Sequence, residues 1–240
     1  MRKFLGAVAI LVVVLVAVVL ISPFTFLPGI WETMVSGNLK DQLGLQERPK
    51  VELESDPALG ILAGSFQSGT VKMSDYDVGK GVFADKVTVD LDPFDVDVAE
   101  SVTGGGVKVG QPPSGSVEVE LSEKDVFEIA KARVEDFPVN DVRLEKDRVL
   151  VDSEAQMLGV AAPVSVAGGL EVRAGNMVFT PENVEAFGIP LPSEVTDALL
   201  GGTDFEYPLT GLPEGTRITD LTVGKNRMTL VGDMESFDLG

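Results

Sequence analysis

Three Asp-x-Asp pairs are the features of this sequence that come nearest to a chemical site: Asp75/Asp77, Asp90/Asp92 and Asp95/Asp97. Residues two apart in a strand share a face, so each pair could present two carboxylates to Ca²⁺. The same alternation is typical of a strand face in water, and no pair extends into an Asp-x-Asp-x-Asp-Gly loop. We therefore predict solvated strand faces and no metal site.

The sequence contains few of the residue types that other kinds of catalysis require. The chain has no histidine and no cysteine, which removes Ser-His and Cys-His nucleophile pairs, imidazole and thiolate metal ligands, and disulfides. A carboxylate pair for glycoside hydrolysis is an open alternative, although one tryptophan and two tyrosines offer few platforms for a sugar. Gly104-Gly105-Gly106 lacks the lysine and hydroxyl of a phosphate-binding loop. A binding or structural protein without a cofactor is favoured over an enzyme.

Net charge narrows the choice of partners. Nineteen basic side chains face 38 acidic ones, giving a formal charge of −19 over 240 residues. Such a chain would repel a phosphate backbone, so no nucleic acid partner is expected. The length fits one or two domains.

The apolar residues are concentrated near the start of the sequence. Phe4–Ile21 has no polar side chain and would form about 27 Å of helix, close to the roughly 30 Å of a bilayer core. Arg2 and Lys3 precede it, so the positive-inside rule keeps the N-terminus in the cytoplasm. We predict a cytoplasmic stub, membrane anchor and interfacial exit over residues 1–31, and an extracytoplasmic domain over residues 32–240. A cleaved signal peptide is the alternative.

The elements of that domain follow from its patterning. Strand-period alternation predicts a β-rich α+β domain, with a curved antiparallel or barrel-like sheet and a few short helices. Hairpins are expected around Glu145–Arg148 and Gly224–Asn226, and two strands are expected to flank Gly168-Gly169. The expected helical segments are Asp56–Ala63, Ser122–Phe137, one starting at Thr180-Pro181, and Ser193–Leu200.

The Ser122–Phe137 helix offers a candidate binding surface. Ser122 with Asp125 resembles a capping box, and the apolar residues fall on one broad side: Val126, Phe127, Ile129, Ala130, Val134 and Phe137. We predict that part of this side, with Ile61, Leu62 and Phe66, lines a cavity for acyl chains. The alternative is ordinary core, because a lipid site and a filled core use the same residue types.

The order of several segments resembles the LmeA-like phospholipid-binding family of actinobacterial envelope proteins. The segments that carry the resemblance are Val51–Gly64, Gly69–Met73, Lys86–Pro93, Gly115–Asp125, Arg148–Gly159, Asn176–Val184, Gly188–Pro192, Tyr207–Pro213 and the closing hairpin to Gly232. The resemblance implies a fold related to tubular lipid-binding domains and a phospholipid or related envelope lipid as partner. It supplies no catalytic residues.

Together these observations predict a membrane-anchored, extracytoplasmic protein that holds phospholipid acyl chains in an apolar cavity and supports envelope lipid or lipoglycan assembly. A non-catalytic structural or interaction protein of the cell envelope, with a filled core, is the alternative. Neither reading identifies a protein partner.

Overall fold

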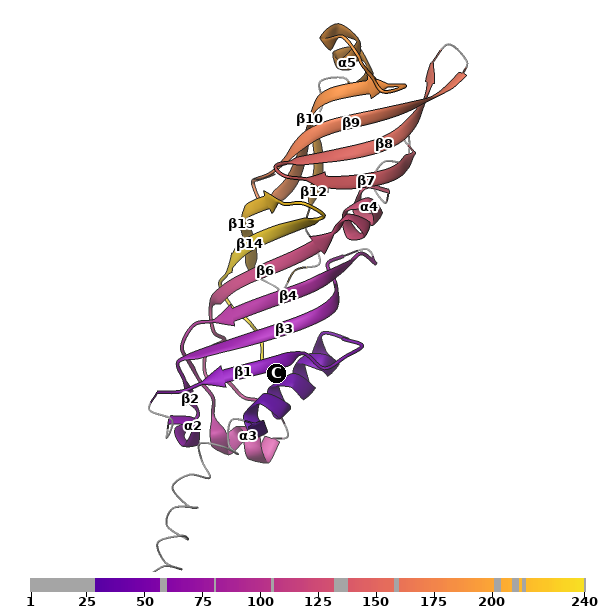
Figure 1. Cartoon of the computed structure of the whole chain (residues 1–240). Coiled ribbons are helices and arrows are strands. Elements are labelled where there is room, and N and C mark those ends of the chain that lie inside the picture. The colour runs from indigo at the N-terminus through magenta and orange to yellow at the C-terminus, as the bar shows by residue number, and fades with distance from the viewer. Residues whose placement is uncertain are drawn as a thin grey trace, which may run out of the picture. The chain divides into compact units, whose positions relative to one another are not determined.

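The computed structural model of the chain is β-rich, with helices that are few and short (Figure 1). It describes residues 29–239 except 57–59, 80, 105, 132–137, 158–159, 201–203, 209–211 and 213–214. At residues 155–157, 160 and 197–200 it describes the backbone but not the side chains. The predicted anchor Phe4–Ile21 lies outside the described residues. Within the described part of the chain, no helix is both long and apolar enough to span a bilayer.

A helix over residues 29–42 comes first. The elements that follow are β1 (Lys50–Glu54), α2 (Gly60–Ala63), β2 (Ser65–Phe66), β3 (Ser68–Asp77), β4 (Phe83–Leu91), β5 (Phe94–Asp95), α3 (Val98–Gly104), β6 (Gly115–Ser122), α4 (Glu123–Lys131), β7 (Val139–Glu145), β8 (Arg148–Met157), β9 (Val160–Arg173), β10 (Asn176–Ala186), β11 (Ile189–Pro190), α5 (Ser193–Leu200), β12 (Phe205–Pro208), β13 (Thr216–Val223) and β14 (Arg227–Met234).

The strands confirm the predicted fold class of a β-rich α+β protein with curved antiparallel sheet. One sheet has the order β1-β3-β4-β6-β14-β13, the second has β11-β10-β9-β8-β7 with β12 beside β10, and β2 pairs with β5. The chain divides into two compact units. The first comprises the described residues up to Lys72, Val89–Gly115 and the chain from Ser236; the second comprises Met73–Thr88 and Ser116–Glu235.

The first unit is built around aromatic rings. The helix over residues 29–42 buries Trp31, Val35 and Leu39, which recur every four residues and so share one face. The Trp31 ring meets Phe66 edge-on with centroids 6.3 Å apart, and Phe66 stacks on Phe94 at 5.2 Å. Trp31 therefore belongs to this core, although it is the last residue of the range 1–31 whose end was predicted to be an interfacial exit from the membrane.

Two short helices close the same unit. Gly64 follows α2 with φ +78°, and a Cβ on it would lie 2.1 Å from the Val96 carbonyl oxygen. Glycine alone fits there, so the end of α2 is held against the backbone at Val96, whose amide donates to the Gly64 carbonyl oxygen at 2.8 Å. Helix α3 was not predicted. It begins where the Asp97 carboxylate accepts a hydrogen bond from the Glu100 amide at 2.8 Å, which is an N-cap interaction.

The second unit confirms the two hairpins. Val142 faces Val151 across the β7–β8 pair, and Asp147 turns the chain with φ +59°. In the β13–β14 pair Val223 faces Met228, and Asn226 turns the chain with φ +63°. Helix α5 covers the predicted Ser193–Leu200 range.

Two predictions in this unit are wrong. Gly168-Gly169 is no turn but lies within the continuous strand β9. Position 168 needs a glycine for another reason: a Cβ there would lie 2.7 Å from the Phe179 ring and 2.4 Å from the Thr180 carbonyl oxygen. Thr180-Pro181 starts no helix but lies within β10. There the register shifts between Pro181 and Asn183, a bulge that suits a residue lacking an amide hydrogen.

Candidate functional site

The first turn of α4 is fixed by its own side chains. The Asp125 carboxylate accepts hydrogen bonds from the Ser122 amide at 2.8 Å and from the Ser122 hydroxyl at 2.7 Å. The Asp125 amide in turn donates to the Ser122 oxygen at 3.4 Å. This reciprocal arrangement is the predicted capping box. Glu123 also anchors the helix to β7, because its carboxylate accepts a 2.8 Å hydrogen bond from the Leu144 amide.

Only part of the apolar side of α4 is buried. Val126 and Ile129 are buried, whereas Phe127 and Ala130 are half-buried at the margin of that face. The Phe127 ring lies 5.7 Å from the Lys131 ammonium nitrogen, a cation–π distance. The other two predicted lining residues, Val134 and Phe137, lie outside the described residues. Phe127 and Ala130 are thus the predicted residues of α4 that keep apolar surface uncovered.

The remaining predicted lining residues belong to the first unit. Ile61 and Phe66 are buried, and Phe66 is already in contact with two other rings. Leu62 points outward, with 52% of its surface exposed. These residues and those of α4 therefore lie in different compact units, and their joint lining of one cavity stays a prediction.

The second sheet has a continuous apolar face that the sequence analysis recognised only in pieces. Residues directly opposite each other on β7, β8, β9 and β10 form it, and we name it the valine face: Val142, Leu144, Val149, Val151, Val164, Val166, Val184 and Ala186. Val151 is half-buried and the others are buried, with Phe179 and Leu191 packed against the β9–β10 part. The alternating valines in the sequence were the signal for this face. Because the sequence analysis divided β9 into two strands at Gly168-Gly169, it did not recognise the face as continuous.

The opposite face of this sheet is polar. Arg143 on β7 forms an ion pair with Asp152 on β8 at 3.1 Å, and the Ser165 hydroxyl donates to the same carboxylate at 2.5 Å. One apolar and one hydrated face is the pattern of an antiparallel sheet that covers something apolar on one side only.

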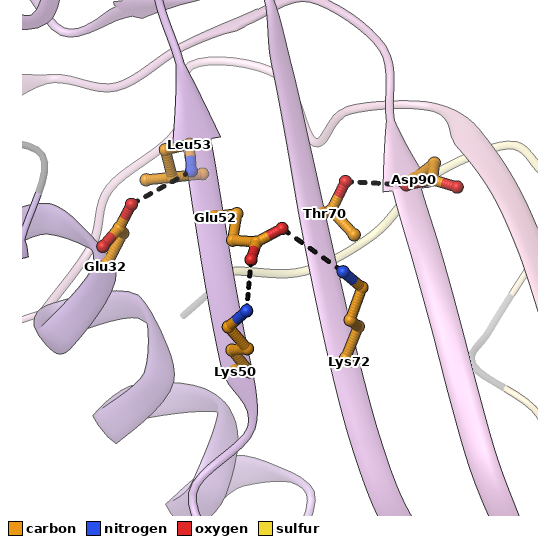
Figure 2. Close-up of polar contacts among 7 residues, drawn as sticks. All are labelled: Glu32, Lys50, Glu52, Leu53, Thr70, Lys72 and Asp90. Atoms are coloured by element: carbon orange, nitrogen blue, oxygen red, sulfur yellow. Dashed lines mark hydrogen bonds and ion pairs between the residues drawn. The ribbon is translucent and has the colours of Figure 1, made fainter.

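The first unit has a similar polar face on β1 and β3, seen in Figure 2. Glu52 lies between Lys50 at 2.5 Å and Lys72 at 3.3 Å. The hydrogen bond from Lys50, followed by that from Lys72, lowers the pKa of the Glu52 carboxyl. These charges neutralise one another on the surface, so they form no isolated site for a phosphate group.

The Asp-x-Asp carboxylates are used locally. Asp90 accepts a hydrogen bond from the Thr70 hydroxyl at 2.7 Å (Figure 2), and Asp92 accepts one from the Ser114 hydroxyl at 2.6 Å. Asp77 accepts from the Gly79 amide at 2.8 Å, as Asp97 does from the first turn of α3. Among the residues that the structure describes, no three acidic side chains gather as a metal ligand set.

Comparison with known proteins gives one match. The model of a family described as LmeA-like phospholipid-binding matches residues 25–233, which include most of both units. No curated protein and no solved structure matches the chain.

Proposed function

The chain belongs to the LmeA-like phospholipid-binding family, and we propose that it binds a phospholipid by holding the acyl chains against apolar side chains. The family match over residues 25–233 is the observation that carries this proposal. The physical basis is area: at about 25 cal/mol per Å², a few hundred Å² of buried acyl chain supplies several kcal/mol. No charge pairing is needed, which suits a chain with a formal charge of −19.

Two described surfaces support the proposal. The valine face is a broad wall of small aliphatic side chains, and α4 adds the half-buried Phe127 and Ala130 in the same unit. We place the acyl chains against these side chains of the second unit. The function is binding rather than catalysis.

The anchor and the location are part of the same proposal. Phe4–Ile21 would hold the protein in the cell membrane, with Arg2 and Lys3 on the cytoplasmic side and the β-rich part outside. A protein placed so could support assembly of envelope lipids or lipoglycans. N-terminal sequencing of the purified native protein should find the segment retained, and added protease should cut the β-rich part from outside. A mature N-terminus beyond Ile21 would instead identify a cleaved signal.

Lipid content is the decisive test. The full chain, purified in mild detergent, should release phospholipid on solvent extraction and carry phospholipid mass in native mass spectrometry. Phe127→Ala should reduce the bound phospholipid per protein by severalfold while changing lipid-free melting little. Glu128→Ala, on the exposed side of the same helix, is the matched control and should change neither. A wild-type protein free of phospholipid would favour the envelope protein with a filled core.

A further inference from the structure

Three large apolar side chains are exposed on the helices of the first unit. Ile30 is the second residue of the helix over residues 29–42, Leu62 lies on α2 and Val102 lies on α3, with exposed fractions of 53%, 52% and 69%. Across α2 and α3 the sole charged side chain is Glu100. Exposed apolar groups with so few charges among them are typical of an interaction surface rather than of a solvated end.

The three helices meet at one end of the first unit. Trp31, beside Ile30, touches Phe66 of β2, which directly follows the α2 turn. A Cβ on Gly64 at the end of α2 would lie 2.9 Å from a methyl carbon of Val98, the first residue of α3. Figure 1 shows α2, α3 and the start of the indigo helix together at this end. We name it the helical end.

The sequence ties the helical end to the bilayer. Ile21 closes the predicted membrane segment, and the described helix begins eight residues later at Gly29. Eight extended residues reach at most about 29 Å, so the helical end must stay within that distance of the segment's exit. The acidic chain gains nothing from an anionic lipid surface by charge, so contact with lipid must be apolar.

We propose that the helical end docks on the outer surface of the bilayer, with Leu62 and Val102 inserted at the level of the lipid headgroups. This rests on the proposed membrane anchor but not on the position of the acyl site. Docking would give the first unit a fixed contact with the membrane from which lipid is drawn.

Single fluorescent labels test the docking, since the chain has no cysteine of its own. Leu62→Cys and Val102→Cys, each labelled with an environment-sensitive dye, are reconstituted as full chains in phosphatidylcholine–phosphatidylglycerol vesicles. Asp41→Cys is the matched control, exposed on the same unit and about 16 Å along the helix from Ile30. We expect blue-shifted emission and at least twofold stronger quenching by spin-labelled lipid at positions 62 and 102 than at position 41.

The outcomes separate docking from the other proposals. Labels that match the control, in protein that floats with the vesicles, would overturn docking and leave anchoring and lipid binding intact. Quenching that persists after detergent solubilisation would mean bound phospholipid rather than bilayer, and would also overturn docking. A blue shift that rises with protein concentration at constant lipid would identify a second copy as the occupant. Protein that fails to float would overturn both the anchor and the docking.

Discussion

Each unit contains an apolar cluster, and the two clusters are built from different kinds of side chain. In the first unit Phe66 is enclosed by the rings of Trp31 and Phe94. In the second unit the valine face consists of six valines, one leucine and one alanine, with Phe179 packed against its β9–β10 part. Interlocked rings make a core that is specific in shape, because every ring fixes its neighbours. A wall of small aliphatic groups is smoother, which suits the flexible hydrocarbon chain that we propose as its ligand.

The comparison separates two roles that the sequence analysis had combined. Phe66 was predicted to line the lipid site together with Phe127, yet Phe66 is enclosed by rings and Phe127 is half-buried beside Lys131. We therefore expect Phe66 to contribute to stability, and we propose Phe127 alone of the two for binding. The first of the following predictions tests that expectation, and the others test contacts within the second unit, in order from the largest expected effect to the smallest.

Phe66→Ala should lower the free energy of unfolding by about 3–5 kcal/mol, the usual cost of removing a buried ring. Urea denaturation monitored by the fluorescence of Trp31 measures it. Phe205→Ala, at a ring with 42% of its surface exposed, should cost far less. A Phe66→Ala protein of near-normal stability that has lost its phospholipid would place the lipid against the aromatic rings and break the comparison.

Gly168→Ala tests the closeness of β9 to β10. The added methyl would lie 2.4 Å from the Thr180 carbonyl oxygen and 2.7 Å from the Phe179 ring, so we expect a loss of about 1–3 kcal/mol. The adjacent Gly169→Ala is an unusually close control, because its nearest neighbour is a Glu182 oxygen at 3.7 Å. Equal melting temperatures for the two variants would show that the strands are more loosely packed than described.

Asp125→Ala removes one half of the capping box. Loss of its hydrogen bonds to Ser122 should cost about 1 kcal/mol, typical of an N-cap. Ser122→Ala should cost a similar amount, and the double variant should cost less than the sum because the two residues act together. Thermal melting of the three variants measures the coupling, and strict additivity would contradict the reciprocal cap.

The smallest expected effect is on the acid side of the stability curve. Lys86, through a 2.6 Å hydrogen bond, lowers the pKa of the Glu120 carboxyl, with a further contribution from Arg227. The resulting stability is present above the ordinary glutamate pKa of 4.5 and is lost as pH falls through the lowered value. Glu120→Gln should remove this pH-dependent part of the free energy of unfolding, about 0.5 kcal/mol. The melting temperature should then fall less steeply below pH 4.5. Glu118→Gln, exposed on the same strand, should leave the curve unchanged.

Local signals predicted local structure well. The two hairpins, the capping box of α4 and the extent of α5 depend on residues close together in the chain, and all are confirmed. Helix α3 was missed although its signal was present: Asp97 followed three residues later by Glu100 is an N-terminal pattern of the same type as that of α4.

The sequence pattern could not predict contacts between residues that are far apart in the chain. The glycines of β9 resemble a turn until Phe179 is known to lie over Gly168. Pro181 resembles the start of a helix until its partner strand is known. For the candidate site, the sequence identified the apolar side of α4 but could not show that Phe66 is enclosed by Trp31 and Phe94, which come from separate segments.

The bulge in β10 leaves that strand one residue longer than its partner requires. Pro181 faces Gly168 and Asn183 faces Ala167, so Glu182 has no opposite residue. Deleting Glu182 would restore an unbroken ladder and keep Val184 and Ala186 on the valine face, whereas inserting a residue into the unbulged β9 would turn its valines outward. The effect of a length change in this sheet is therefore asymmetric: a single-residue deletion at position 182 preserves the register, whereas a single-residue insertion in β9 shifts it.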